Sequence, residues 1–269
     1  VQKVILGKRE IVEKVLMAVL AQGHVLLDDV PGVGKTTLAM AFARALGLET
    51  RRVQFTPDTM PSDILGFSVY DKQAGAFSYQ PGAVMTNLLL ADEINRTSTK
   101  TQAALLEAME ERRVTVDGKT HPLPQPFFVL ATQNPVGSAG TQLLPPAQLD
   151  RFLIKTDMGY PSSEDGVQIL SRFKSENPLD AIEPVASAAD VIDAQRSYTA
   201  VHIARSMLEY IVQIAEETRR HPDVVLGVSP RGTQALLKTV QVHAILAGRD
   251  FVTPDDVKAM AGPVFGHRI

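Results

Sequence analysis

The residues with the clearest chemical potential are 29–37, which read Asp-Val-Pro-Gly-Val-Gly-Lys-Thr-Thr. They directly follow the apolar run 25–27, so the pattern predicts a buried strand, a glycine-rich turn and a new helix. Such a turn directs several backbone N–H groups into one concavity. The positive end of the helix dipole adds to them, which favours a polyphosphate ligand. In this motif Lys35 reaches the β- and γ-phosphates, and the Thr36 hydroxyl reaches Mg²⁺.

Asp29 departs from the usual phosphate-loop pattern, which begins with glycine. Gly32 and Gly34 still allow the tight part of the loop to form. From the local sequence alone, an ordinary strand-to-helix turn with an exposed lysine remains the alternative.

Polar side chains also follow two further apolar runs. Asp92 and Glu93 end the first, where Asp92 is placed to hold Mg²⁺ through water and Glu93 to orient and deprotonate an attacking water. Asn134 ends the second, and its amide would reach both the γ-phosphate and the water if the two strands are neighbours. The alternatives are a solvated turn for the two acids and a turn-forming asparagine before Pro135.

Two arginines are candidates for stabilising charge on a transferring phosphoryl group. Arg151 precedes the last apolar run, and Arg231 is the second residue of a predicted helix. An arginine that reaches the transferring group accelerates hydrolysis by about 10³–10⁵-fold. From the residues alone, however, a surface salt bridge is the better interpretation of both.

The elements that would position these residues are short apolar runs at 25–27, 52–55, 87–91, 127–131 and 152–156. Helical stretches separate most of them, notably 36–46 and 99–111. Strands that are apolar throughout are typical of a parallel sheet buried between helices, so we predict an α/β fold with five such strands.

Two segments break this alternation and are predicted to form hairpin inserts, near 66–81 and 113–121. The second has Asp117-Gly118 at its tip, a strong hairpin signal. Beyond about residue 160 only helical patterns occur. We therefore predict an α/β domain over 1–158, which carries the inserts, and an all-helical domain over 159–269.

The composition is that of an ordinary globular protein, with 269 residues, 45% of them hydrophobic. The formal net charge of −3 argues against a strongly basic nucleic-acid surface. The chain has no cysteine, which fits a reducing compartment, and we expect a cytoplasmic protein without membrane insertion.

Together these residues resemble the AAA+ ATPases, and specifically the MoxR family, from about Val4 to Ile269. The most specific stretch is Ala91-Asp92-Glu93-Ile94-Asn95-Arg96 with the helix that follows it. Further characteristic segments are 23–27, 131–135, Gln148-Leu149-Asp150-Arg151-Phe152, Ser229-Pro230-Arg231 and 252–257. The fold that this resemblance implies is a P-loop NTPase core with an all-helical lid.

The resemblance also implies roles for the candidate residues. Residues 29–36 resemble the Walker A loop, Asp92 and Glu93 the Walker B acids, and Asn134 the sensor-1 residue. Arg151 matches an arginine finger that reaches a neighbouring subunit, with Arg112 and Arg113 as alternatives, and Arg231 resembles the sensor-2 arginine of the lid. Thr36 and Asp92 would hold Mg²⁺. The residues expected to bind ATP or ADP are Pro31, Gly32, Val33, Gly34, Lys35, Thr36, Thr37, Asp92 and Arg231.

The family resemblance implies a ring, as a hexamer, that hydrolyses ATP and does chaperone-like work on a client protein complex. A partner with a von Willebrand A domain often accompanies such proteins. We expect nucleotide between the α/β domain and the lid, with Ile5 and Gly7 near the adenine, and no nucleic acid. Two other classes stay open: a DNA motor of the helicase type, and a nucleotide-gated binding module that hardly hydrolyses ATP.

Overall fold

The computed structural model describes residues 1–30, 32–73, 75–134, 143–173 and 178–269. Its centre is a parallel sheet of five strands in the order β2-β5-β8-β1-β9, and helices lie on both faces of this sheet. The predicted α/β class with a five-stranded parallel sheet is therefore confirmed. In this strand order β1 lies between β8 and β9, so the loop after β1 begins at the carboxyl edge of the sheet with a strand on either side.

The elements of the first half are α1 (Arg9–Leu20), β1 (Val25–Asp28), α2 (Lys35–Ala45), β2 (Thr50–Gln54), α3 (Pro61–Leu65), β3 (Gly66–Asp71), β4 (Ala76–Pro81), β5 (Leu88–Asp92), α4 (Thr99–Glu111), β6 (Arg113–Val116), β7 (Lys119–Pro122) and β8 (Phe128–Gln133). Those of the second half are α5 (Pro146–Leu149), β9 (Ile154–Thr156), α6 (Ser163–Phe173), α7 (Ala188–Ser197), α8 (Arg205–Arg220), α9 (Pro230–Leu246) and α10 (Pro254–Phe265).

The sheet separates two hydrophobic layers, because successive side chains of a strand point to opposite faces. In β1, Val25 and Leu27 belong to the layer that contains α1, α2 and the C-terminal helices, whereas Leu26 belongs to the layer formed with α4. All three are fully buried. Burial on both faces explains why the central strands are continuous apolar runs.

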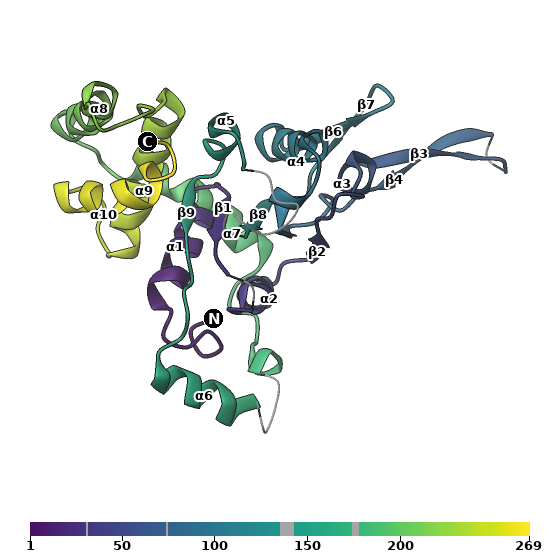
Figure 1. Cartoon of the computed structure of the whole chain (residues 1–269), viewed down its shortest axis with the longest axis horizontal. Helices are drawn as coiled ribbons and strands as arrows, with labels where there is room; N and C mark the ends of the chain where they lie inside the picture. The colour runs from purple at the N-terminus through teal and green to yellow at the C-terminus, as the bar shows by residue number, and fades with distance from the viewer. Residues whose placement is uncertain (31, 74, 135–142, 174–177) are drawn as a thin grey trace.

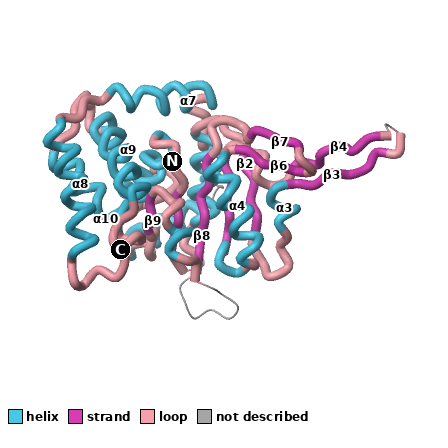
Figure 2. Tube along the Cα trace, turned by 90° about the horizontal axis from the view of Figure 1, so that it is seen from above, coloured by secondary structure: helices cyan, strands magenta, loops and turns pink. Residues whose placement is uncertain are grey.

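Both predicted inserts are antiparallel hairpins, β3–β4 and β6–β7, and they extend from the β2 side of the sheet (Figures 1 and 2). Asp117 and Gly118 both have positive φ at the tip of β6–β7, as the predicted turn requires. The two hairpins touch where the Tyr79 and His121 rings stack with centroids 3.9 Å apart. The inserts are thus one connected projection away from the core.

The helices after β9 do not form one compact group, and α7 packs on α1. α8, α9 and α10 lie at the β9 side of the sheet, across the molecule from the hairpins, while α6 lies apart from them below α1 and α2 (Figure 1). α9 packs on α1, and α10 packs on β9. The expected helical region is present, but its C-terminal helices do not cover the loop after β1.

Candidate active site

The loop after β1 has the backbone that a phosphate loop needs. Gly32 and Gly34 have φ values of +85° and +98°, a region that disfavours residues with a Cβ atom. Gly34 is the N-cap of α2, so the loop leads straight into the helix N-terminus. Lys35 is buried, and its Nζ donates a hydrogen bond to the Asp29 carbonyl at 2.9 Å. Of the predicted nucleotide-binding residues, Pro31 lies outside the described residues.

Asp29 has a structural reason to replace the usual first glycine. Its Oδ2 accepts hydrogen bonds from the backbone N–H groups of Met158 (2.6 Å) and Gly159 (2.8 Å), and its Oδ1 accepts from the Val30 N–H (2.8 Å). This buried carboxylate therefore ties the start of the phosphate loop to the segment that leads from β9 into α6.

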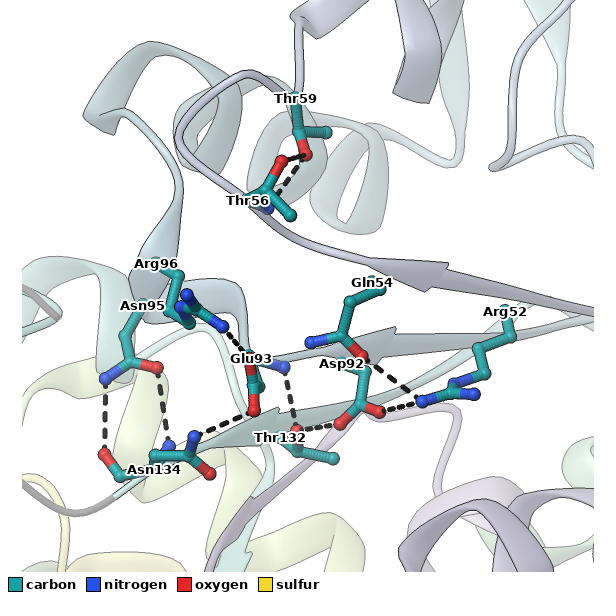
Figure 3. A network of polar contacts seen from close by, with 10 residues as sticks. All are labelled: Arg52, Gln54, Thr56, Thr59, Asp92, Glu93, Asn95, Arg96, Thr132 and Asn134. Atoms are coloured by element: carbon teal, nitrogen blue, oxygen red, sulfur yellow. Dashed lines mark hydrogen bonds and ion pairs between the residues drawn. The ribbon is translucent and has the colours of Figure 1, made fainter. Parts of the chain in front are cut away.

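Three of the other predicted residues meet at the carboxyl edge of the sheet, around Thr132 on β8 (Figure 3). Thr132 Oγ1 donates to Asp92 Oδ1 at 2.6 Å and accepts from the Glu93 N–H at 2.9 Å. Asn134 Nδ2 donates to Glu93 Oε1 at 2.9 Å. The strands β5 and β8 are direct neighbours, so the condition for bringing the amide beside the acids is met.

Glu93 has an unusual backbone and a well-paired carboxylate. Its φ of 58° and ψ of 47° are left-handed, which is uncommon outside glycine. Arg96 Nη1 donates to Glu93 Oε2 at 2.8 Å, so both carboxylate oxygens accept a hydrogen bond. Burial raises the pKa of Glu93, but the hydrogen bonds from Arg96 and Asn134 outweigh it and hold the pKa below its usual value. Glu93 is therefore ionised at neutral pH, as a general base must be.

Asp92 is paired with a residue that the sequence analysis did not single out. Arg52 on β2 donates from Nη2 to Asp92 Oδ2 at 2.8 Å, and the same nitrogen donates to Gln54 Oε1 at 3.2 Å. The strand β2 is the edge strand next to β5, which explains the proximity. No local pattern in the sequence marks Arg52, because its importance depends on this strand order.

The residues at this edge fit a nucleotide with a magnesium ion. Among the described residues no group of three or more acidic or histidine side chains forms a metal cage. Mg²⁺ suits such a site, since it commonly takes one or two carboxylates together with substrate phosphates and waters. The buried Oδ1 of Asn134 also has no hydrogen-bond partner among the described residues, which leaves an acceptor free for a water.

A cavity of about 430 Å³ lies next to the phosphate loop. Ile5, Leu6 and Lys8 line it from the N-terminal segment, and Ile169 and Arg172 line it from α6. Ile5 therefore lies beside the phosphate loop, while Gly7 is not among the lining residues although both its neighbours are. The position of the adenine stays a prediction. The helical region that faces this cavity is α6, not α8–α10.

Arg151 and Arg231 lie together but away from the phosphate loop of their own chain. Both line a cavity of about 210 Å³ together with residues 21–24, just before β1, and with the last turn of α4 and Arg112 after it. This is the amino edge of the sheet, and the loop is at the carboxyl edge, at least the length of β1, about 13 Å, away. Arg231 was expected at the nucleotide site of its own chain, but the structure places it in this cavity at the opposite edge of the sheet.

Contacts between distant motifs explain why these two arginines meet. Ser229, the N-cap of α9, donates from Oγ to Asp150 Oδ2 at 2.8 Å, and Arg268 donates from Nε to Asp150 Oδ1 at 2.7 Å. Arg231 pairs with Glu110 at 2.9 Å, and Arg151 donates to the Leu106 carbonyl at 2.8 Å. Of the alternatives, Arg112 lines the same cavity, whereas Arg113 is exposed, pairs with Glu111 and does not line it.

Comparison with known proteins gives two domain matches. A model described as ATPase family associated with various cellular activities (AAA) matches residues 24–154, and an AAA lid domain model matches residues 216–269. The chaperone MoxR1 of Mycobacterium tuberculosis is 39% identical over the whole chain and 73% of its own length. The chain belongs to the MoxR family of AAA+ ATPases. It is therefore an ATP-hydrolysing enzyme of that family.

Further relatives agree with this assignment to the MoxR family. The protein YeaC of Bacillus subtilis is 52% identical over the whole chain and 84% of its own length. A solved structure from Cytophaga hutchinsonii, described as an ATPase, is 36% identical with a TM-score of 0.91 and covers 99% of this chain and 84% of its own. No helix among the described residues is long and apolar enough to span a membrane.

Proposed function

We propose that this MoxR-type ATPase hydrolyses ATP to ADP and phosphate and uses the reaction to remodel, assemble or activate partner protein complexes. The observation that carries this proposal is the joined network of Asp92, Thr132, Glu93 and Asn134 at the sheet edge that also bears the phosphate loop. The network places a carboxylate that could hold a metal ion (Asp92), a general base (Glu93) and an amide (Asn134) at the edge where the triphosphate would lie.

The phosphate loop is the proposed binding element for the triphosphate. Backbone N–H groups from Gly32 to Thr37 at the N-terminus of α2 would hold the β- and γ-phosphates, and Lys35 would exchange its Asp29 carbonyl partner for phosphate oxygens. Thr36 and Asp92 would hold Mg²⁺, which neutralises phosphate charge when bound. Arg52 would then have to release Asp92 Oδ2, its partner in the present structure.

Glu93 is the proposed general base. A water held between Glu93 and the free Oδ1 of Asn134 would give its proton to the carboxylate while its oxygen bonds to the γ-phosphorus. The bond between that phosphorus and the β–γ bridging oxygen breaks, and ADP leaves with the bonding electrons. Asn134 would link Glu93 to the γ-phosphate, because its amide already donates a hydrogen bond to the carboxylate of Glu93.

The arginines at the amino edge support assembly into a ring. Because Arg151 and Arg231 cannot reach the phosphate loop of their own chain, their proposed target is nucleotide on a neighbouring copy. A head-to-tail contact that joins one edge to the other closes into a ring, for which we propose six copies. Each site would then be complete only at a subunit interface.

The paired hairpins are the proposed contact for the client. Phe67, Tyr70 and Phe77 on β3–β4 are each at least half exposed, and the rings of Tyr70 and Phe77 pack edge to face. Exposed aromatic groups suit a protein surface, including that of a von Willebrand A domain partner, better than a nucleic-acid backbone. The helicase-type alternative has a more distant relative: the branch-migration subunit RuvB of Synechococcus is 30% identical over 78% of this chain, but only 56% of its own length is covered.

The direct test of this function is phosphate release from ATP at rising protein concentration. We expect turnover per chain to increase with concentration, because each site needs a neighbouring copy. Lys35→Ala should abolish turnover and tight nucleotide binding together, with Lys258→Ala, at an exposed lysine of α10, as the control. Turnover that stays negligible at high concentration would favour a nucleotide-gated binding module, and many-fold stimulation by DNA would favour a helicase-type motor.

A further inference from the structure

The cavity at the amino edge of the sheet carries an excess of positive charge. Five basic side chains and two acidic ones line it, which leaves three positive charges in excess. His24 adds none, because burial lowers its pKa to about 4 and its Nδ1 accepts a hydrogen bond from the Val129 N–H. The cavity is thus electrostatically suited to an anion.

The excess charge can be assigned to particular residues. Arg231 pairs with Glu110 and Arg268 pairs with Asp150, so these two are balanced. Among the residues that the structure describes, Arg112 donates to the carbonyl and side-chain oxygens of Gln22 and to no carboxylate. Within the described part of the chain, Arg151 donates to a backbone carbonyl and to no carboxylate. Three cations therefore lack an acidic partner among the described residues: Arg112, Arg151 and Lys238.

Lys238 differs from the other two because its amino group makes no hydrogen bond or ion pair among the described residues. It lies on α9 seven positions after Arg231, so the two side chains project from the same face of the helix. Loss of solvent and the nearby charge of Arg112 lower the pKa of Lys238, while Glu110 opposes them. An anion that entered the cavity would relieve the repulsion between these cations.

The size of the cavity limits what can enter it. Its 210 Å³ is below the roughly 300 Å³ at which pockets begin to hold whole drug-sized ligands, but a phosphate group fits. A phosphate could come from solution or from a nucleotide held by another copy. The second source agrees with the position of Arg151 and Arg231 at the edge that would meet a neighbouring copy.

We propose that Lys238, together with Arg112, completes a receptor for the terminal phosphate of ATP bound to the phosphate loop of a neighbouring copy. This inference rests on the proposed ATP hydrolysis and adds cations that the two predicted arginines do not account for. Lys238 would act on the γ-phosphate as negative charge builds up on it in the transition state.

The test uses Lys238→Met, with Lys238→Arg to restore the charge and Lys258→Met, at an exposed lysine of α10, as a matched control. We expect Lys238→Met to lower kcat by about 10²-fold, the typical cost of removing one transition-state donor, with little change in KM. Lys238→Arg and the control should keep most of the activity. Lys238→Met should not lower Tm, because it removes an unpaired cation from a crowded site.

Mixing variants identifies where Lys238 acts. Lys35→Ala copies cannot hydrolyse ATP but carry an intact Lys238, so they should restore turnover to Lys238→Met copies. The double variant Lys35→Ala/Lys238→Met should not. An isotope-edited NMR titration of Lys35→Ala with inorganic phosphate, followed at the lysine and arginine side chains, tests for a free-anion site.

The outcomes separate this inference from the function on which it rests. If the wild-type protein shows no turnover at any concentration, the proposed function fails. If the wild type is active and Lys238→Met equals it, only the inference is overturned. Loss of activity without rescue by Lys35→Ala copies also overturns it. So does tight binding of inorganic phosphate at Lys238 of the Lys35→Ala protein, which would make the cavity a site for a free anion.

Discussion

Glu93→Gln is expected to bind ATP with unchanged affinity and to lose turnover by about 10²–10⁴-fold. The amide keeps the size of the side chain and still offers one oxygen as an acceptor, but it cannot take the proton of the attacking water. The low pKa of Glu93 makes the wild-type side chain an anion at neutral pH, so the change removes a charge as well as a base. Phosphate release and binding of a fluorescent ATP analogue measure the two quantities separately.

The matched control for this prediction is Glu107→Gln, an exposed glutamate on α4. It should keep wild-type turnover. If Glu93→Gln also does so, Glu93 is not the base. If Glu93→Gln loses nucleotide affinity instead, the carboxylate contributes to binding, and its contacts with Arg96 and Asn134 would then be structural.

Arg151→Ala is expected to leave nucleotide binding intact and to reduce turnover by about 10³–10⁵-fold, the effect of losing an arginine finger. The reason is geometric, since Arg151 lies at the amino edge of the sheet and its charge has no acidic partner among the described residues. Mixing it with Lys35→Ala copies, which have an intact Arg151, should restore part of the activity.

The control for Arg151 is Arg113→Ala, one of the two alternatives for the arginine finger. Arg113 is exposed on β6, pairs with Glu111 and does not line the amino-edge cavity, so its loss should be nearly neutral. Activity of Arg151→Ala that does not recover on mixing would mean that Arg151 acts within its own chain. Arg112, which lines the cavity, would then be the better candidate.

Much of the fold was predictable because apolar runs mark buried strands. The runs at 25–27 and 87–91 lie within one residue of β1 and β5. The runs at 127–131 and 152–156 each miss one end by two residues, because β8 ends at Gln133 and β9 begins at Ile154. The strand β2, expected at 52–55, is found at Thr50–Gln54. As the edge strand it is only partly buried, and exposed and half-buried residues alternate along it, so its start is not marked by apolar residues.

The site residues that belong to a short local motif could be predicted from the sequence. Those whose position depends on contacts between distant segments could not. The loop glycines and the acids after β5 follow from short patterns. The pairing of Arg52 with Asp92 depends on which strands are neighbours. The location of Arg231 depends on the docking of α9, whose Ser229 bonds to Asp150, a residue 79 positions earlier.

We propose that one copy binds the triphosphate and that its neighbour completes the site. A structure of assembled Glu93→Gln protein with ATP and Mg²⁺ tests it most directly. We expect the γ-phosphate to lie against the N–H groups of Gly32 to Thr37, with Arg151 of the adjacent copy within hydrogen-bond distance. Triphosphate bound away from this loop, or an Arg151 that faces no neighbouring nucleotide, would contradict it.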